Sequence, residues 1–303
     1  MLGSEGTLGT VAVIGGPTAS GKTRAAIELA KHFNTEVINA DSRQFYKAMR
    51  IGTARPREEE LEGVRHHFIG HLALEETWSA GAFARAAEPV LRSILGANGI
   101  AILTGGSGLY LDALLKGLDP LPATDVRLRE KLIARVRDHG LQDLLLELER
   151  LDPITHATLD QRNPHRVIRA LEICLISGRP ASTQRSTPRD RQDVRIIRLH
   201  MELPREVLYA KIDARVDQMV RNGLVEEARA LLPFRHLNAL RTVGYREMFP
   251  YFDDEYGLLD AIEKIKQHTR NYAKRQLTWS RREKDVIRIH PSDIAGMIQR
   301  ITA

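Results

Sequence analysis

Residues 16–23 have the sequence GPTASGKT and fit the phosphate-binding pattern G-x-x-x-x-G-K-[ST] in full. Glycine at both ends lets successive backbone N–H groups turn inward around phosphate oxygens, and the helix that follows presents its positive N-terminus. Lys22 adds a cation, and the Thr23 hydroxyl can reach a Mg²⁺ that bridges those oxygens. We therefore expect a phosphate site, with Mg²⁺ as cofactor, formed by Gly16, Pro17, Thr18, Ala19, Ser20, Gly21, Lys22 and Thr23.

The residues at the ends of two apolar segments indicate which kind of phosphate the loop binds. Asp41 follows segment 36–39, and α/β sheets bind ligands at the carboxyl ends of their strands. Segment 100–103 instead ends in the sequence TGGS, without the aspartate that commonly holds Mg²⁺ in P-loop NTPases. We expect Asp41 to lie near the phosphate loop, although a helix N-cap before Gln44 is the alternative on local pattern.

Apolar, β-branched segments that alternate with helical patterns predict a parallel, doubly wound α/β sheet of the P-loop NTPase type. We expect strands at residues 10–14, 36–39, 68–69, 100–103, 194–199 and 286–289, and helices at 22–33, 78–95, 204–220, 224–232 and 258–283.

Between the two halves of this pattern the strand signals disappear. Helical patterns cover residues 126–137, 141–151 and 164–177, and a polar, proline-containing stretch at 178–193 is expected to be a mobile loop. The sequence therefore predicts an α/β core of residues 1–118 and 197–303, with a basic C-terminal helical part, and an all-helical insertion of residues 119–196.

Charge is concentrated in one part of the chain. The net charge is +6, and the only acidic residue between 264 and 284 is Glu283. Such a run favours a nucleic-acid partner, although a solvated helix face is the alternative. Its basic residues are Lys264, Lys266, Arg270, Lys274, Arg275, Arg281, Arg282 and Lys284.

Composition excludes several classes of protein. No apolar stretch reaches the roughly 18 residues of a membrane span, and the start lacks the features of a signal peptide. The single cysteine, Cys174, lies in an apolar run and cannot build a disulfide framework. His66, His67 and His71 have no Cys or carboxylate at ligand spacing, so we expect structural roles for them. We expect a cytoplasmic monomer that does not bind membranes.

A series of ordered motifs between about residue 10 and about residue 290 resembles the tRNA dimethylallyltransferases. After the phosphate loop come NADSRQFY at 39–46, IGTARP at 51–56, TGGSGLY at 104–110, GLDPLP at 117–122, NPHRVIRALE at 163–172, QMVRNGLVE at 218–226, RTVGYRE at 241–247 and NYAKRQLTWSR at 271–281. Together they are far more specific than a phosphate loop.

The resemblance implies transfer of a dimethylallyl group from dimethylallyl diphosphate to N6 of adenosine 37 in tRNAs that read codons beginning with U. The phosphate loop would bind the diphosphate of the donor with Mg²⁺, and Arg215 would add a charge-assisted contact. By the same resemblance Asp41 is a general base, Ser107 is a hydroxyl near the donor phosphate or the target nucleotide, and Thr23 serves the metal.

The target adenosine must leave the base stack of the anticodon stem-loop before it can react. By resemblance to the family's tRNA-contacting segments, we expect tRNA contacts from several parts of this chain. The residues are Asp41, Ser42, Arg43, Gln44, Ser107, Arg129, His165, Arg166, Val167, Ile168, Arg169, Arg241, Thr242, Val243, Gly244, Tyr245, Arg246, Lys274, Arg275, Gln276, Leu277, Thr278, Trp279, Ser280 and Arg281. His165 stands where the family usually has Gln. On pattern alone, solvated helix faces and a core role for Trp279 remain the alternatives.

Three other functions are alternatives that share part of this pattern of residues. A small-molecule kinase would bind ATP at the phosphate loop and close a lid with Arg185, Arg189 and Arg191. An adenylate isopentenyltransferase shares the loop but has little use for the basic segment 264–284. A non-catalytic tRNA-binding protein does not need Lys22, Thr23 and Asp41 intact.

Overall fold

The computed structural model describes residues 7–185, 189–281, 283 and 285–303, so Arg282 and Lys284 of the basic segment lie outside the described residues. The chain forms two units, one of Met1–Leu115 with Arg191–Ala303 and one of Lys116–Asp190. The second boundary therefore falls earlier than the predicted 196, because Arg195 and Ile196 pair with the first strand of the sheet. The first boundary moves from 118 to 115, where a helix of the larger unit ends.

In the described residues of the larger unit, six strands form one parallel sheet with the order β3-β2-β4-β1-β5-β6. This confirms the predicted α/β fold with a parallel sheet and a helical insertion. The strands are β1 (Thr10–Gly15), β2 (Val37–Asn39), β3 (His66–His67), β4 (Ile100–Thr104), β5 (Arg195–Met201) and β6 (Val286–Ile289).

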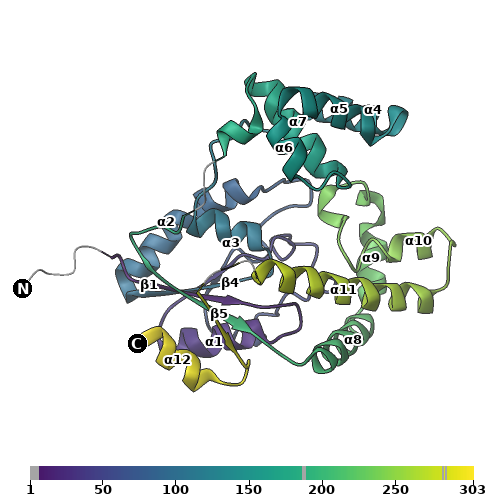
Figure 1. The fold of residues 1–303 in the computed structure, drawn as a ribbon. Helices are drawn as coiled ribbons and strands as arrows, with labels where there is room; N and C mark the ends of the chain where they lie inside the picture. Colours follow the sequence, from purple (N-terminus) through teal and green to yellow (C-terminus); the bar gives the residue numbers. More distant parts are fainter. Residues whose placement is uncertain (1–6, 186–188, 282, 284) are drawn as a thin grey trace, which may run out of the picture. The chain divides into compact units, whose positions relative to one another are not determined.

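Helices cover both faces of this sheet (Figure 1). α1 (Lys22–His32) and α12 (Ile294–Thr302) pack on one face, where Leu29 and Ile301 join β1 in one apolar cluster. α2 (Ala80–Asn98) and α3 (Gly108–Leu115) pack on the other. The β1 side chains are almost wholly buried, which explains its unbroken apolar sequence. Because both faces are covered, ligands can enter only at the strand ends.

The third strand is the one strand whose predicted place was wrong. It was expected at residues 68–69, but β3 is His66–His67. Phe68 has φ of +62°, in the left-handed region, so the extended conformation ends before it. Its ring packs in an aromatic cluster with Phe83 and Trp78, which gives its apolar character another cause than a strand.

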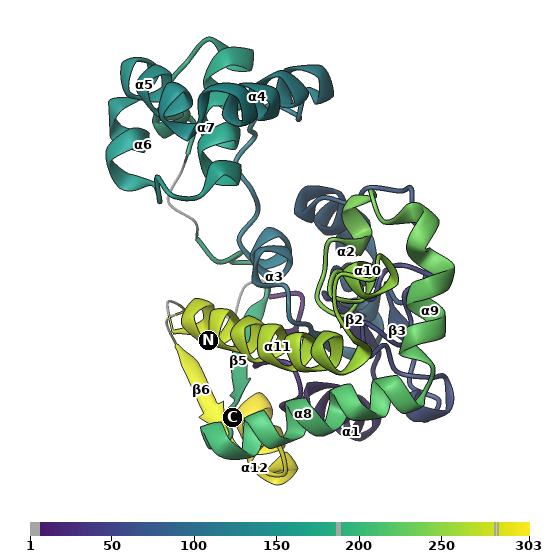
Figure 2. The same ribbon diagram turned by 90° about the vertical axis from the view of Figure 1, so that its right-hand side faces the viewer.

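The remaining helices of the larger unit lie beyond β5. They are α8 (Arg205–Arg221), α9 (Leu224–Leu231), α10 (Met248–Phe252) and α11 (Leu258–Ser280), with short 3₁₀ turns at Leu232–Phe234 and Asn238–Leu240. A further 3₁₀ turn, Glu59–Leu61, lies between β2 and β3. α8 and α11 run side by side (Figure 2), joined by Leu208 and Ile212 of α8 against Ala273 of α11. Ion pairs Arg270–Asp213 and Lys266–Asp217 add to this contact. The pairing places the basic helix against the helix that carries Arg215.

The smaller unit is all helical: α4 (Val126–His139), α5 (Leu141–Leu151), α6 (Pro153–Thr158) and α7 (Pro164–Ser177), followed by a 3₁₀ turn at Ala181–Gln184. Its core includes Leu132, Leu148, Leu171 and Cys174. Part of the stretch predicted as a mobile loop is ordered, because the buried Asp152 carboxylate accepts hydrogen bonds from the Ser182 backbone and hydroxyl at 2.7 Å. Residues 186–188 of that stretch lie outside the described residues. Within the described chain, no helix combines the length and apolarity needed to cross a membrane.

Candidate active site

The phosphate loop connects β1 to α1 in a conformation that its glycines permit. Gly16 has φ of +143° and Gly21 of +96°, and a Cβ at Gly16 would lie 2.9 Å from the Met201 Cβ. Lys22 Nζ donates a hydrogen bond to the Pro17 carbonyl at 2.7 Å, which closes the loop on itself. Ser20 is fully buried and its hydroxyl has no partner in the described structure. The loop therefore has the form that the motif predicts.

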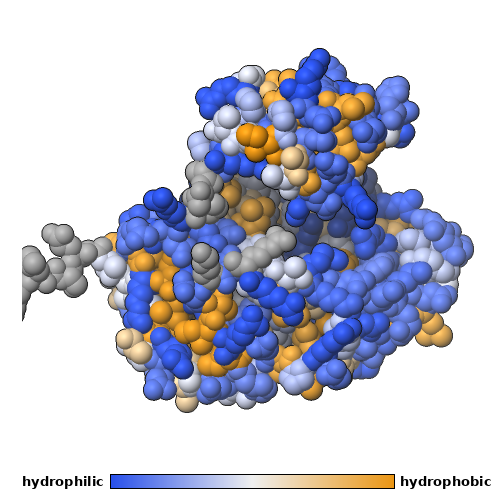
Figure 3. Space-filling view, viewed as in Figure 1, coloured by the Kyte–Doolittle hydropathy of each residue, from blue (hydrophilic) through white to orange (hydrophobic). Residues whose placement is uncertain are grey.

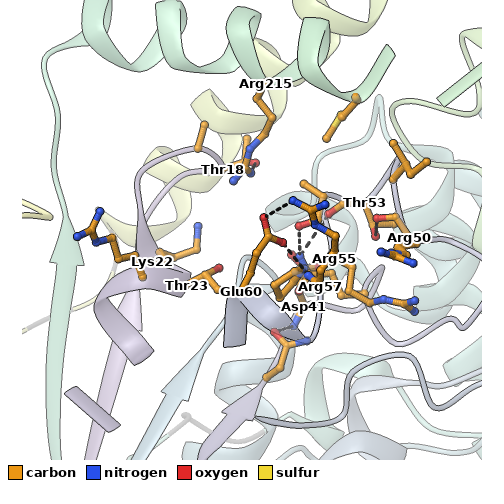
Figure 4. A pocket seen from close by; sticks show the side chains of 18 of the residues that line it. Thr18, Lys22, Thr23, Asp41, Arg50, Thr53, Arg55, Arg57, Glu60 and Arg215 are labelled. Atoms are coloured by element: carbon orange, nitrogen blue, oxygen red, sulfur yellow. Dashed lines mark hydrogen bonds and ion pairs between the residues drawn. The ribbon is translucent and has the colours of Figure 1, made fainter. Parts of the chain in front are cut away.

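A cavity of about 1160 Å³ opens beside this loop (Figure 4). The predicted site residues that line it are Thr18, Ala19, Gly21, Lys22, Thr23, Asp41, Gln44, Arg215 and Gln276. Segments from both halves of the larger unit thus meet around one space. Gly16, Pro17 and Ser20 support the loop from behind and are not part of the wall.

The charged groups around the cavity shift one another's pKa values. Burial lowers the pKa of Lys22 to about 8, while the Asp41 carboxylate raises it and the Arg215 guanidinium lowers it. Burial likewise lowers the pKa of Arg215, and Asp41 opposes that shift. Arg215 Nη1 donates a hydrogen bond to Thr18 Oγ1 at 3.4 Å. Two partly desolvated cations therefore face one carboxylate, an arrangement that favours binding of an added anion.

Asp41 is held in place by its own turn. One carboxylate oxygen, Oδ1, accepts the Arg43 N–H at 3.0 Å, and Asn39 Oδ1 accepts the Asp41 N–H at 3.4 Å. No α-helix starts after Asp41 in the described part of this turn, so the alternative role as a helix N-cap is wrong. Among the described residues, none donates a hydrogen bond to Oδ2, which leaves that oxygen available to a ligand in the cavity.

Ser107 is not on the cavity wall. Its Oγ accepts the Ser42 N–H at 3.1 Å and bonds to Ser42 Oγ at 3.1 Å. It joins the turn after β4 to the turn that carries Asp41. Gly105 allows this approach, since a Cβ there would lie 2.5 Å from the Ala40 carbonyl carbon. In this conformation Ser107 supports the turn that carries Asp41 through its bonds to Ser42.

A second, basic wall was not predicted. Residues 50–60 line the cavity with Arg50, Thr53, Arg55, Arg57 and Glu60. Arg57 pairs with Glu60, as the dashed lines in Figure 4 mark, and Arg55 Nη1 donates to the Tyr46 carbonyl at 2.8 Å. The motif at 51–56 was the signal in the sequence, but it gave no reason to assign these side chains to the site.

Glu227 of α9 fixes this wall, and sequence reasoning missed it as well. Its carboxylate accepts the N–H groups of Arg50 at 3.1 Å, Ile51 at 2.8 Å and Gly52 at 2.9 Å. The Tyr245 hydroxyl donates to the same carboxylate at 2.6 Å. Charge-assisted bonds to three successive amides define the path of the loop. Because Gly52 and Glu227 are 175 residues apart in the chain, no local pattern indicates this contact.

The predicted RNA-contacting segment 241–246 divides into exposed and buried positions. Arg241 and Arg246 are exposed, Thr242 and Val243 are half-buried, and Gly244 is buried. Tyr245 is wholly buried, and this burial raises its pKa. Gly244 packs on Gly52, where a Cβ would meet the Gly52 carbonyl oxygen at 3.2 Å. Tyr245 and Gly244 therefore position the basic wall and do not offer a surface to RNA.

The C-terminal part of α11 divides in the same way. Lys274, Arg275, Thr278 and Arg281 are exposed, whereas Gln276, Leu277, Trp279 and Ser280 are half-buried. Trp279 packs on Gly108, where a Cβ would lie 2.3 Å from Cε2 of the indole. The surface over α8, α10 and α11 is largely hydrophilic (Figure 3). An exposed basic face and a site-facing edge thus share one helix.

In the smaller unit, His165 and Arg166 are exposed at the start of α7, but Val167 and Ile168 are 0% and 5% exposed. These two side chains belong to the core of the smaller unit, so their expected contact with tRNA stays a prediction. Arg129 and Arg169 both bind Oε2 of the buried Glu172, at 2.8 Å and 2.9 Å. Their guanidinium groups are held in fixed positions while remaining partly exposed.

Other candidates are occupied by structural contacts. Arg191, expected in a kinase lid, pairs with Glu88 and Asp193 at 2.7 Å each. His67 pairs with Glu36, and His71 packs in the aromatic cluster around Trp78. Among the residues described, no three His, Cys, Asp or Glu side chains gather closely enough to hold a metal ion.

Comparison with known proteins gives matches to one family of transferases. The model of the IPP transferase family matches residues 44–283. The tRNA dimethylallyltransferase of Christiangramia forsetii is 45% identical over 271 residues, which cover 89% of this chain and 90% of that protein. tRNA dimethylallyltransferase 1 of Phocaeicola vulgatus is 43% identical over 292 residues, with 96% and 97% covered.

Solved structures agree. The full-length tRNA isopentenylpyrophosphate transferase of Bacillus halodurans gives a TM-score of 0.71 at 35% identity, covering 98% of this chain and 95% of that one. A eukaryotic dimethylallyltransferase acting on tRNA gives a TM-score of 0.77 at 27% identity, covering 95% and 75%. The resemblance seen in the motifs is therefore confirmed, and the chain belongs to the IPP transferase family, the prenyltransferases that include the tRNA dimethylallyltransferases.

Proposed function

We propose that this enzyme transfers the dimethylallyl group of dimethylallyl diphosphate to N6 of adenosine 37 in tRNAs that read codons beginning with U, and releases diphosphate. The observation that carries the proposal is that Lys22, Arg215 and the Asp41 carboxylate face one cavity. The cations suit a leaving diphosphate, and the carboxylate suits an acceptor amine that must lose a proton.

The phosphate loop would bind the diphosphate of the donor. Backbone N–H groups at the start of α1, Lys22 and Arg215 neutralise the charge that develops as the C–O bond of the allylic diphosphate breaks. Stabilising that leaving group is the main requirement, since the allylic carbon readily carries positive charge.

The same end of the cavity fits a Mg²⁺ ion. Mg²⁺ is held by one or two protein oxygens together with phosphate oxygens and water, without a cage of several carboxylates. The Thr23 hydroxyl lines the cavity at the start of α1 and would supply a protein oxygen. When bound, the ion supplies further positive charge to the diphosphate oxygens.

Asp41 is proposed as the general base. The lone pair of the adenosine amine is delocalised into the ring, so a carboxylate that accepts one N–H both orients the amine and removes its proton as the new bond forms. Oδ2 is the oxygen for this task, because Oδ1 already accepts the Arg43 N–H. Gly106 lies beside this oxygen, since a Cβ there would be 3.4 Å from Oδ2.

RNA contacts are proposed for the exposed cations of each unit. Lys274, Arg275 and Arg281 on or beside α11, with Arg241 and Arg246, form such a set in the larger unit, and His165 and Arg166 in the smaller one. These suit the phosphates of an anticodon stem-loop from which the adenosine is flipped. We further propose that the enzyme acts as a monomer in the cytoplasm, where tRNA is modified.

A free adenine nucleotide is the second candidate acceptor. The same cavity could hold it, and the difference lies in the exposed basic face of α11, which a nucleotide does not need. The ATP-dependent kinase has weaker support, because Arg191 of its expected lid is fixed by Glu88 and Asp193.

Transfer of radiolabelled dimethylallyl diphosphate tests the proposal. Unmodified tRNA with Mg²⁺ and without ATP should become labelled, and replacement of adenosine 37 by guanosine should abolish the label. Labelling of AMP in preference to tRNA would assign the acceptor to free nucleotides. Absence of label from both, with ATP consumed in the presence of a hydroxylated metabolite, would contradict the proposal.

A further inference from the structure

The phosphate loop and the turn that follows β4 are separate segments, yet one side chain of α11 bonds to both. Gln276 Oε1 accepts the Thr18 N–H at 2.8 Å, and Gln276 Nε2 donates to the Gly106 carbonyl at 3.0 Å. The residues joined are 258 and 170 positions away in the chain. We infer that Gln276 is a positioning residue that sets the donor loop relative to the general base; this rests on the proposed function.

The position of Gly106 explains why this bridge reaches the base. A Cβ on Gly106 would lie 2.4 Å from Gln276 Nε2 and 3.4 Å from Asp41 Oδ2. The amide of Gln276 and the free oxygen of Asp41 therefore lie on the same side of one glycine. Tyr272, one turn earlier on α11, also bonds to the Gly106 carbonyl, at 3.4 Å. If the turn that carries Gly106 were displaced, the groups next to Asp41 Oδ2 would move with it.

The other end of the bridge lies in the donor loop. Ala19, next to Thr18, packs against the apolar cluster formed by α8 and α11. The Thr18 hydroxyl is bonded to Arg215 of α8. With its N–H taken by Gln276, Thr18 faces the donor with its side chain, and the amides nearer α1 remain for the diphosphate. Two helices therefore hold the loop from one side.

The reaction gives this geometry its importance. The bond to the allylic carbon breaks toward the phosphate loop while the new bond forms from the amine that Asp41 orients. These groups belong to different loops, and a misplacement of about 1 Å can reduce a rate about a hundredfold. A primary amide fits the bridge because it accepts and donates at once, whereas a carboxylate only accepts and leucine does neither.

Two substitutions separate the acceptor and donor roles of the Gln276 amide. Gln276→Leu removes both bonds, and Gln276→Glu keeps an acceptor for Thr18 but loses the donor to Gly106. At neutral pH the new carboxyl group of the Gln276→Glu variant is ionised. This variant therefore regains a donor only when the pH falls through the range of that carboxyl group, near about pH 4.3 or somewhat above. The matched control is Gln267→Leu, on the exposed face of the same helix.

Three measurements test the bridge: calorimetric binding of inorganic pyrophosphate with Mg²⁺ and without tRNA, kcat and both KM values for transfer between about pH 4 and about pH 8, and thermal melting. For Gln276→Leu we expect kcat to fall about tenfold and pyrophosphate affinity about fivefold, in line with two lost hydrogen bonds. The KM for tRNA and the melting temperature should match those of Gln267→Leu. For Gln276→Glu, the kcat ratio to wild type should rise as the pH falls.

Equal kcat and pyrophosphate affinity in Gln276→Leu and Gln267→Leu would overturn the inference. So would a parallel loss of melting temperature and of both KM values, which indicates a merely structural side chain, or a Gln276→Glu ratio that does not change with pH. A wild-type chain that binds pyrophosphate but transfers nothing would contradict the proposed function instead, and the difference in pyrophosphate affinity would still decide the bridge.

Discussion

The Asp41 carboxylate opposes the fall in the Lys22 pKa that burial causes, although the two residues come from different strand ends. Of the groups that act on the pKa of Lys22, Asp41 is the one that favours its charged form. In the proposed reaction a bound diphosphate would take over that role, and Asp41 would be free to accept a proton from the amine. In that reaction one carboxylate would connect donor binding to the chemistry of the acceptor.

Replacement of Asp41 should separate binding from transfer. We expect Asp41→Ala to reduce kcat by about 10²- to 10⁴-fold, the usual contribution of a general base. Affinity for tRNA should stay nearly unchanged, because the exposed cations are untouched. Single-turnover transfer and filter binding of tRNA measure the two effects. Turnover retained at the wild-type rate would remove Asp41 from the base role.

Binding of the diphosphate should weaken in alkaline solution. The pKa of Lys22 is lowered to about 8, so the cation of the free enzyme is lost as the pH rises through that value. We expect pyrophosphate affinity, measured by calorimetry as a ratio to Lys22→Met at each pH, to fall between about pH 7 and about pH 9. The ratio cancels the titration of pyrophosphate itself. A ratio that is constant over this range would contradict the shift.

Stability should decrease in mild acid because of His200. Burial lowers its pKa to about 4 from an ordinary 6.5, so the folded chain binds fewer protons than the unfolded chain between those values. The free energy of unfolding therefore falls as the pH drops from about 6.5 toward about 4. Urea unfolding should show a smaller fall in His200→Asn. The exposed His236→Asn is the control, and an equal pH dependence in both variants would exclude His200 as the cause.

Exposed cations of α11 should govern the salt dependence of tRNA binding. We expect Lys274→Ala and Arg275→Ala each to weaken binding and to reduce the slope of log affinity against log salt by about one. Arg235→Ala, in which the lost cation was paired with Asp253, provides the comparison. Unchanged slopes in the α11 variants would show that this face does not contact phosphate.

Local sequence was enough to predict the elements whose cause is local. Periodicity placed β4, β6, α5 and α7 within a residue or two, and the phosphate loop was readable because all its residues are consecutive. α6, a helix of six residues from Pro153, was missed because it is too short to show a period. The predicted end of α11 at 283 was too late, since the helix ends at Ser280.

The parts of the site that sequence could not reveal depend on distant contacts. Nothing near Glu227 shows that its carboxylate will bind the amides of residues 50–52. Val167 and Ile168 stand beside Arg166 and Arg169 in one motif, but helical geometry turns them inward while it leaves the charged residues accessible. A motif therefore identifies a segment, and only the fold separates the side chains that contact a ligand from those that support it.

The bonds from the loop at residues 50–52 to Glu227, whose carboxylate also accepts the Tyr245 hydroxyl, bear on the order of events during synthesis. A nascent chain folds from its N-terminus as it leaves the ribosome. It can carry a complete phosphate loop long before residue 227 has been added, yet until then one wall of the cavity has no fixed path. A chain that ends before residue 227 would therefore lack the carboxylate that fixes this wall of the cavity.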